Sequence, residues 1–249
     1  MAQTVISTIN GKIQELRLPD CDEEVLPGIK WGHYYATFTP SFWASLAWLN
    51  QVEGQSPDHR IGKTLAEEIT ACLLGGYGIP AEIGLAAFRR LKEEGLLRGT
   101  PVAQARLCEA LSAPLVVHGR QVRYRFAPQR SKYVSAALIK LAEVDPPVDD
   151  LAFRQWLLDF QGVGPKTASW ITRNWLNSEK VAIIDIHIHR AGLLIGLFNK
   201  DESPARHYFE MEEKFLAFAR NIGVRASLLD ALIWRQMKDA GSMIFRLLK

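Results

Sequence analysis

The sequence predicts an all-α protein, mostly helical, with two lobes and one small β-hairpin. Helix starts are marked by a capping residue followed by proline at the first helical position. This pair occurs at Thr39-Pro40, Thr100-Pro101 and Ser203-Pro204. Apolar residues then recur at helical spacing, as they do between Ile61 and Leu73, and this period is the main sequence signal of an amphipathic helix. Alternation typical of strands is confined to one segment, 115–126.

The expected elements follow one another from residue 39 to residue 240. Prolines and glycines interrupt residues 1–38, which show no clear pattern. The expected helices cover 39–52, 58–74, 80–95, 100–111, 129–143, 149–159, 165–177, 186–196, 203–221 and 225–240. The β-hairpin is expected from 115–117 and 121–126, because Val122, Tyr124 and Phe126 alternate with arginines.

Composition excludes several classes of protein. Hydrophobic residues make up 48% and charged residues 23% of the chain, which is typical of a packed soluble protein. We see no apolar run long enough to cross a bilayer and no signal peptide at the start. The net charge of +3 is compatible with a polyanionic partner. Three scattered cysteines give no disulfide framework and no metal spacing, and they fit a reducing compartment.

Residues 157–190 carry the strongest functional signal. Residues 161–164, Gln-Gly-Val-Gly, lie between two expected helices, and Lys166 follows in the first turn of the second helix. Free N–H groups at such a helix start bind phosphate, and glycines allow a ligand to come close. A lysine there opposes the helix dipole, which favours a role as a neutral nucleophile. Asp185 adds a carboxylate inside an apolar run. Together these residues predict nucleophilic chemistry on a nucleic acid.

The same residues also have plain structural interpretations. The glycines could simply join two helices, and Lys166 could be a solvated surface residue. Asp185 could cap the helix that begins at Ile186. Capping and chemistry can coexist, because one carboxylate oxygen can cap while the other faces a cleft.

The run 181–189 leaves a metal site open as an alternative. If it is a strand, Asp185, His187 and His189 share one face and could belong to a metal-dependent hydrolase. If it is a helix, the two histidines separate, and His187 could reach a phosphate near Asp185.

The spacing of these residues resembles that of a known family. Residues 162–166, Gly-Val-Gly-Pro-Lys, followed by Asp185 in Ile-Asp-Ile-His, are similar to the motif of the helix-hairpin-helix DNA glycosylases. Lys166 resembles the nucleophile of the bifunctional members, which are also AP lyases. The pair Asp185 and His187, the segment 125–133 and the lack of four clustered C-terminal cysteines resemble the 8-oxoguanine branch rather than endonuclease III. The likeness is specific over 157–190 and diffuse over 39–240.

The resemblance implies a base-excision enzyme. Lys166 would attack the sugar and form a Schiff base that allows strand cleavage, and Asp185 would stabilise positive charge on the sugar. The partner would be double-stranded DNA with a damaged or modified base, 8-oxoguanine being the best match, rotated out of the helix. The implied DNA-binding residues are Gln161, Gly162, Val163, Gly164, His187 and Arg190. The candidates for lining the base pocket or filling the gap are Trp31, Tyr77, Trp170 and Trp234.

The resemblance also implies an organisation and a setting. Residues 1–249 would form one glycosylase unit, in which 1–56 packs with the C-terminal helices. Residues 57–178 would form a helical lobe ending in the helix-hairpin-helix motif at about 151–177, and 179–249 would form the second lobe. We expect a monomer without membrane contact, in the bacterial or archaeal cytoplasm or the eukaryotic nucleus. No iron–sulfur cluster or other cofactor is expected, although the hairpin carbonyls could bind a monovalent cation.

Two departures from the family leave the target base and its opposite base open. The segment 75–78, Gly-Gly-Tyr-Gly, stands where many members have asparagine or glutamine, and Trp170 is larger than its counterpart in the animal enzymes. A non-catalytic helix-hairpin-helix DNA-binding protein remains an alternative, since it would need the hairpin but neither Lys166 nor Asp185.

Overall fold

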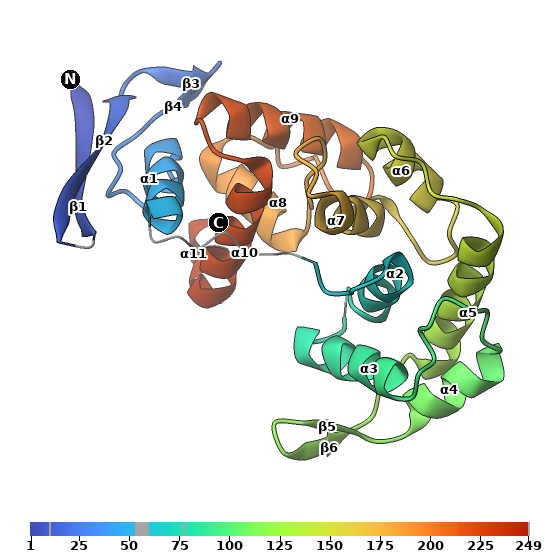
Figure 1. Ribbon diagram of the computed structural model, residues 1–249. Helices are drawn as coiled ribbons and strands as arrows, with labels where there is room; N and C mark the ends of the chain where they lie inside the picture. Colours follow the sequence, from blue (N-terminus) through green and yellow to red (C-terminus); the bar gives the residue numbers. More distant parts are fainter. Residues whose placement is uncertain (10, 53–59, 77, 249) are drawn as a thin grey trace. The chain divides into compact units, whose positions relative to one another are not determined.

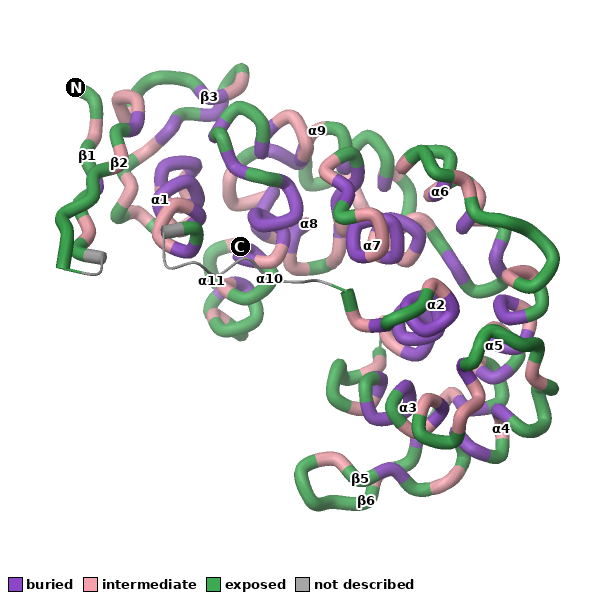
Figure 2. Tube along the Cα trace, in the orientation of Figure 1, coloured by how far each residue is buried: buried purple, intermediate pink, exposed green. Residues whose placement is uncertain are grey.

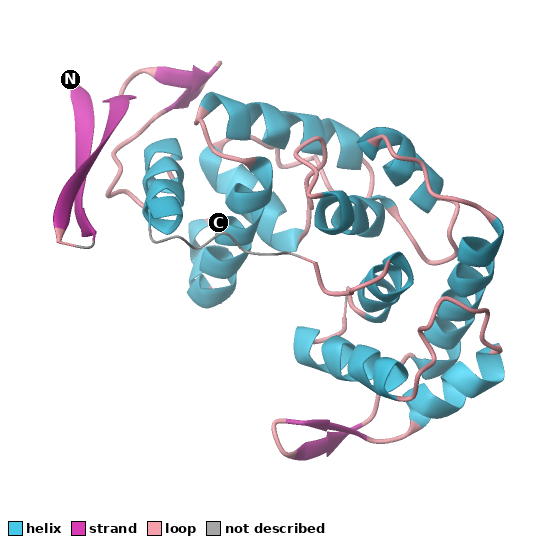
Figure 3. Ribbon diagram, viewed as in Figure 1, coloured by secondary structure: helices cyan, strands magenta, loops and turns pink. Residues whose placement is uncertain are grey.

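The computed structural model describes residues 1–9, 11–52, 60–76 and 78–248, and most of its elements are helices (Figures 1 and 3). The chain forms two compact units. The first unit contains Met1–Asp58 and Glu179–Lys249, and the second contains His59–Ser178. The predicted all-α class is confirmed, and in the part of the chain that the structure describes the strands form small two-stranded pairs. None of the described helices is both long and apolar enough to cross a membrane.

The first unit begins with two β-hairpins that the sequence analysis did not predict. Strand β1 (Ala2–Ile9) pairs antiparallel with β2 (Lys12–Asp20), and β3 (Glu24–Leu26) pairs with β4 (Ile29–Lys30). The helices of this unit are α1 (Pro40–Val52), α8 (Ile186–Ile195), α9 (Tyr208–Asn221), α10 (Ala226–Ala240) and α11 (Met243–Leu247). Most of the described residues between 2 and 30 therefore lie in β-strands.

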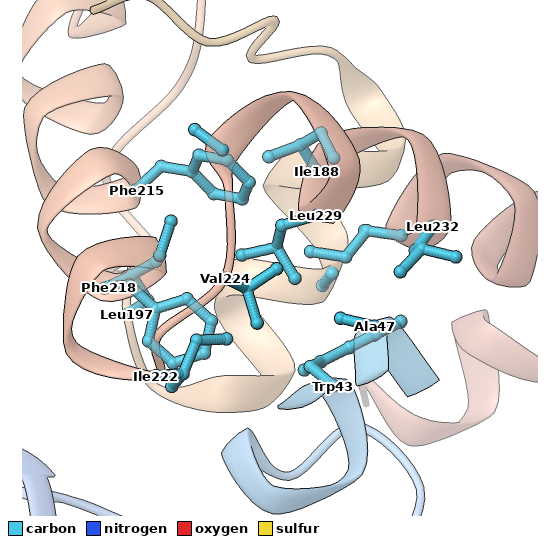
Figure 4. Packing of buried hydrophobic residues seen from close by; sticks show 14 of the residues in the cluster. Trp43, Ala47, Ile188, Leu197, Phe215, Phe218, Ile222, Val224, Leu229 and Leu232 are labelled. Atoms are coloured by element: carbon cyan, nitrogen blue, oxygen red, sulfur yellow. The ribbon is translucent and has the colours of Figure 1, made fainter. Parts of the chain in front are cut away.

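The core of the first unit holds α8 in place. Phe215 and Phe218 of α9 pack with Leu229 of α10, Ile188 of α8 and Trp43 of α1 (Figure 4). Helix α10 packs against α1, α8, α9 and α11. Each fully buried apolar side chain contributes roughly 1.5–3 kcal/mol. The start of α8, where Asp185 lies, is thus built on a rigid base.

The second unit is organised around α2. Its elements are α2 (Leu65–Leu74), α3 (Ala81–Glu93), α4 (Gln104–Ser112), β5 (Leu115–Val117), β6 (Arg120–Val122), α5 (Ala127–Glu143), α6 (Asp150–Leu157) and α7 (Pro165–Leu176). Residues 66–74 of α2 are all buried (Figure 2), and α2 packs against α3, α5 and α7. Helix α6 packs against α7, which sets the frame for the turn between them.

Several predicted boundaries in the chain are wrong. Helix α2 begins at Leu65 rather than residue 58, α4 at Gln104 rather than 100, and α9 at Tyr208 rather than 203. Strand β6 ends at Val122. Tyr124 does not continue the strand, because its side chain turns inward and its hydroxyl donates to the carbonyl of Leu74 at 2.7 Å.

Candidate functional site

The turn between α6 and α7 is fixed by a few local interactions. Asp149 caps α6, because its Oδ1 accepts hydrogen bonds from the N–H groups of Leu151 and Ala152, both at 3.0 Å. Val163 points inward, with 8% of its surface exposed, and its N–H donates to the Phe160 carbonyl at 3.0 Å. We call residues 161–164 the glycine hairpin. Its other three residues are exposed.

The two glycines of the hairpin serve different purposes. Gly162 has φ +86°, and a Cβ there would lie 2.2 Å from Cδ2 of Tyr133, so the fold itself requires glycine. Gly164 has φ −99° and ψ 179°, which any residue can adopt, and a Cβ there would meet no atom of the described chain within 4 Å. The positive φ that favours glycine therefore occurs at Gly162 and not at Gly164. Because Gly164 has no side chain, the space next to its backbone is open to a ligand.

The start of α7 presents N–H groups that no atom of the described chain accepts. Within the described residues, the backbone N–H groups of Gly164, Lys166 and Thr167 have no acceptor, and the first helical bond runs from Ala168 to the Gly164 carbonyl at 2.9 Å. Pro165 has no N–H group. Lys166 is half-buried beside this exposed backbone. The arrangement provides several donors and one amine at the positive end of a helix, which is the chemistry that binds a phosphate.

The difference between the glycines gives the first prediction. Gly162→Ala should destabilise the protein by about 1–3 kcal/mol, because it combines an unfavourable φ with a clash. Gly164→Ala should leave the melting temperature unchanged within about 1 °C, since extended backbone with open space accepts a methyl group. If a phosphate approaches the hairpin there, Gly164→Ala should nevertheless weaken duplex DNA binding about tenfold.

Melting temperature and duplex affinity are measured on the same preparation of each variant. Full affinity in Gly164→Ala would contradict the phosphate cradle and leave the glycine hairpin as a simple connection between helices. Duplex affinity should also fall steeply with added salt, because phosphate contacts release counterions.

Asp185 caps α8, as one of the two interpretations predicted. Its Oδ1 accepts hydrogen bonds from the N–H groups of His187 at 2.8 Å and Ile188 at 2.9 Å. Its other oxygen, Oδ2, has no partner among the described residues. The cap fixes the carboxylate while leaving one oxygen available for a ligand.

The metal-site alternative at 181–189 is wrong. It required a strand, whereas Ile186–Ile195 is helix α8, and consecutive positions of a helix turn by about 100°. His189 faces the loop before α9, where its Nε2 lies 3.0 Å from the Glu202 carbonyl, and burial lowers its pKa despite that hydrogen bond. His187 instead has its ring edge-on to Trp234, with the ring centroids 6.2 Å apart.

Among the described residues, three potential metal ligands come together at Asp20, Cys21 and Asp22 and not at the two histidines of α8. His187 takes part in the cap through its backbone, since its N–H donates to Oδ1 of Asp185. Its Nδ1 is buried without a partner in the described part of the chain.

The four aromatic candidates have different surroundings. Trp234 is 40% exposed, and the Lys238 ammonium lies 4.9 Å from its ring centroid. Trp170 is half-buried against Gly75, where a Cβ would lie 3.4 Å from the ring. Trp31 is 8% exposed and packs within the core of the first unit, so little of its surface is open to a ligand. Tyr77 lies outside the described residues.

The remaining DNA-binding candidates lie on the surface or near it. Gln161 is exposed at the glycine hairpin, and Arg190 is half-buried on α8. The sequence analysis missed a third group of residues, a buried polar network between α2 and α7 that contains Glu68 and Asn174. Glu68 gave a weak signal, as a charged residue inside the most apolar helix of the second unit.

The fold and the turn define a class of protein. Two packed helices joined by a glycine hairpin, with exposed N–H groups at the start of the second helix, make this a helix-hairpin-helix protein. The family model described as 8-oxoguanine DNA glycosylase matches residues 55–224. The chain belongs to this family.

Individual relatives agree with the family match. The chain is 32% identical over 127 residues to an 8-oxoguanine DNA glycosylase/AP lyase of Saccharolobus islandicus. This alignment covers 46% of the chain and 60% of that relative, so only part of the relative's length is matched.

Solved structures share the fold. The 8-oxoguanine DNA glycosylase of Methanocaldococcus jannaschii is 25% identical, with a TM-score of 0.56 over 70% of this chain and 78% of that one. The 8-oxoguanine glycosylase of Thermotoga maritima has a TM-score of 0.54 at 23% identity, covering 78% of this chain and 88% of that one.

Proposed function

We propose that the protein is a bifunctional DNA glycosylase and AP lyase that removes an oxidised purine, with 8-oxoguanine as the first candidate, from double-stranded DNA. The observation that carries the proposal is Lys166, an amine beside unsatisfied N–H groups at the exposed start of α7, in a chain of this family. The curated relative is named for both activities, glycosylase and lyase.

Lys166 is the proposed nucleophile. Its neutral Nζ attacks C1′ of the sugar, and the glycosidic bond breaks with its electron pair leaving on the base, which is protonated as it departs. The attached nitrogen then loses one proton, the C1′–O4′ bond breaks as O4′ takes up a proton, and a protonated Schiff base forms between C1′ and Nζ. Loss of a proton from C2′ then expels the 3′ phosphate by β-elimination, and water finally releases the lysine. Holding the amine in line with the sugar carbon makes this step effectively intramolecular.

Asp185 supplies the negative charge in this proposal. As the base departs, positive charge grows on the sugar, and a carboxylate fixed in place stabilises that charge without having to reorganise. The N-cap holds Asp185 by Oδ1, and Oδ2 stays available. The same oxygen can accept a proton during the attack of Lys166.

The other residues bind and orient the DNA. The glycine hairpin holds a phosphate through its backbone, which gives no sequence preference. Trp234 offers an exposed ring that can stack on a base, as aromatic side chains do in sites that take up flipped bases. The reaction draws on Lys166 and Asp185 and needs no cofactor. We place this activity in the cytoplasm or the nucleus, reducing compartments that the three free cysteines fit.

A panel of duplex oligonucleotides tests the proposal. The duplexes carry 8-oxoguanine opposite cytosine or adenine, an oxidised pyrimidine, a plain abasic site or no lesion, and strand nicking is scored. We expect the fastest nicking at 8-oxoguanine and none in undamaged DNA. Binding to every duplex without nicking would indicate a non-catalytic DNA-binding protein. Preference for the oxidised pyrimidine would overturn the assignment of the base while keeping the reaction.

A further inference from the structure

A buried polar network joins α2 to α7 in the second unit. The Glu68 side chain is 0% exposed. Its Oε2 accepts hydrogen bonds from the backbone N–H groups of Ile61 and Gly62, both at 2.7 Å. Its Oε1 accepts one from Nδ2 of Asn174 at 2.7 Å and lies 4.0 Å from the Cys72 thiol. One buried carboxylate therefore ties three segments of the chain together.

The fold is shaped around this carboxylate. A buried charge is unfavourable unless its oxygens are paired, and an apolar residue usually fills such a place at lower cost. Gly62 approaches so closely that a Cβ there would lie 2.4 Å from the Glu68 nitrogen. Asn174 is 4% exposed, and its Oδ1 accepts from the Arg173 guanidinium at 3.1 and 3.2 Å. The orientation of the Asn174 amide is thus specified from both sides.

Asn174 shares one face of α7 with Lys166. Residues 166, 170 and 174 are spaced by four, so their side chains form a stripe along the helix. The stripe faces α2, since Asn174 binds Glu68 and Trp170 packs at the end of α2. Burial and the Glu68 charge raise the pKa of the Cys72 thiol, and the positive charges of Arg173 and, to a smaller extent, Lys166 act against that rise.

A buried hydrogen bond fixes a helix more tightly than apolar contacts do. Apolar side chains tolerate small slides and rotations, whereas a shift of about 1 Å breaks a hydrogen bond and leaves a buried charge unpaired. Eight residues of helix separate Asn174 from Lys166, a rise of about 12 Å. Any rotation or slide of α7 that breaks the bond at Asn174 moves Lys166 as well.

We propose that Glu68 and Asn174 are positioning residues for Lys166. Their bond sets the rotation and axial position of α7 and so aims the lysine amine at the sugar carbon. This inference rests on the proposed function, in which Lys166 is the nucleophile. Misplacement of a reacting group by about 1 Å can cost on the order of 10²-fold in rate. DNA binding through the exposed glycine hairpin depends much less on that alignment.

The test measures the single-turnover rate of borohydride-trapped adduct, together with duplex affinity and melting temperature. Glu68→Gln places an amide donor against the Asn174 amide, and Asn174→Ala removes the donor. Each should slow trapping about 10- to 100-fold with affinity changed less than about threefold. In the double variant Glu68→Gln/Asn174→Asp, the new amide at position 68 can donate to the new carboxylate at position 174. The other carboxylate oxygen can still accept from Arg173. It should recover the trapping rate to within about fivefold of wild type.

Glu67→Gln is the matched control. Glu67 binds the Lys92 ammonium and the Lys63 N–H, both at 2.7 Å, and has no bond to α7. The Glu67→Gln variant should have a lower melting temperature than wild type and an unchanged trapping rate. Wild-type trapping rates in the folded Glu68 and Asn174 variants would overturn this inference and leave the proposed function intact. A double variant that regains stability but not the trapping rate would do the same. A wild-type protein that forms no adduct on any lesion overturns both this inference and the proposed function. If the Glu68→Gln variant does not fold, the trapping rate of Asn174→Ala tests the inference by itself.

Discussion

Replacing Lys166 by glutamine is expected to abolish the borohydride-trapped adduct and to lower strand nicking by on the order of 10⁴-fold or more, as removal of a covalent nucleophile does. Glutamine has a similar length and good helix propensity. It cannot form a Schiff base, because its amide nitrogen is not nucleophilic. Duplex binding should fall little, since the hairpin N–H groups remain.

Lys200→Gln is the control for this prediction. Lys200 is an exposed lysine of the first unit and has no part in the proposed chemistry. Its variant should nick and trap at the wild-type rate. An undiminished adduct in Lys166→Gln would show that another amine is the nucleophile.

Asp185→Asn is expected to slow turnover about 10²–10³-fold, the loss typical of removing one electrostatic group that acts on the transition state. Asparagine caps helices about as well as aspartate, so the bonds to the His187 and Ile188 N–H groups should persist. The melting temperature should therefore stay within about 2 °C of wild type.

Single-turnover rates and duplex affinities separate chemistry from binding in this variant. Asp185→Ala is the comparison, because it removes both the charge and the cap and should lower stability by about 1 kcal/mol. If Asp185→Asn loses affinity as strongly as rate, the carboxylate serves the fold or DNA binding rather than the reaction.

The local parts of the site could be predicted from the sequence because they depend on neighbouring residues. Pro165 pre-sets the first turn of α7, and Asp185 accepts from N–H groups two and three residues ahead. The inward direction of Val163 follows from its place between two exposed glycines. Such features need no knowledge of distant segments.

The start of a helix was harder to predict where the pair of a capping residue and proline belongs to a turn that precedes the helix. Ser203-Pro204 does not open α9, since the Ser203 carbonyl accepts from the N–H groups of Arg206 and His207 in a turn of its own. The first β-hairpin was missed although its sequence carries a signal. Asn10-Gly11 after the run 4–9, which is rich in β-branched residues, is a strong hairpin pattern.

The buried network could not be predicted from the sequence. Glu68 and Asn174 are 106 residues apart in the sequence. Each is a polar residue in a helix whose apolar residues are sufficient to explain why that helix is buried. Their pairing depends on how α2 packs against α7, which no local pattern reports. The different roles of the two hairpin glycines also appear only in three dimensions, because Tyr133 comes from α5.

The most direct measurement is to map the amino acid joined to DNA in the borohydride-reduced adduct. Wild-type protein is trapped on a duplex that contains 8-oxoguanine, digested with protease and nuclease, and the modified peptide is identified by mass. Our account predicts a single modified peptide that contains Lys166 and carries the reduced sugar remnant on its amine. A remnant on another lysine, or no adduct on this duplex or any other damaged one, would contradict it.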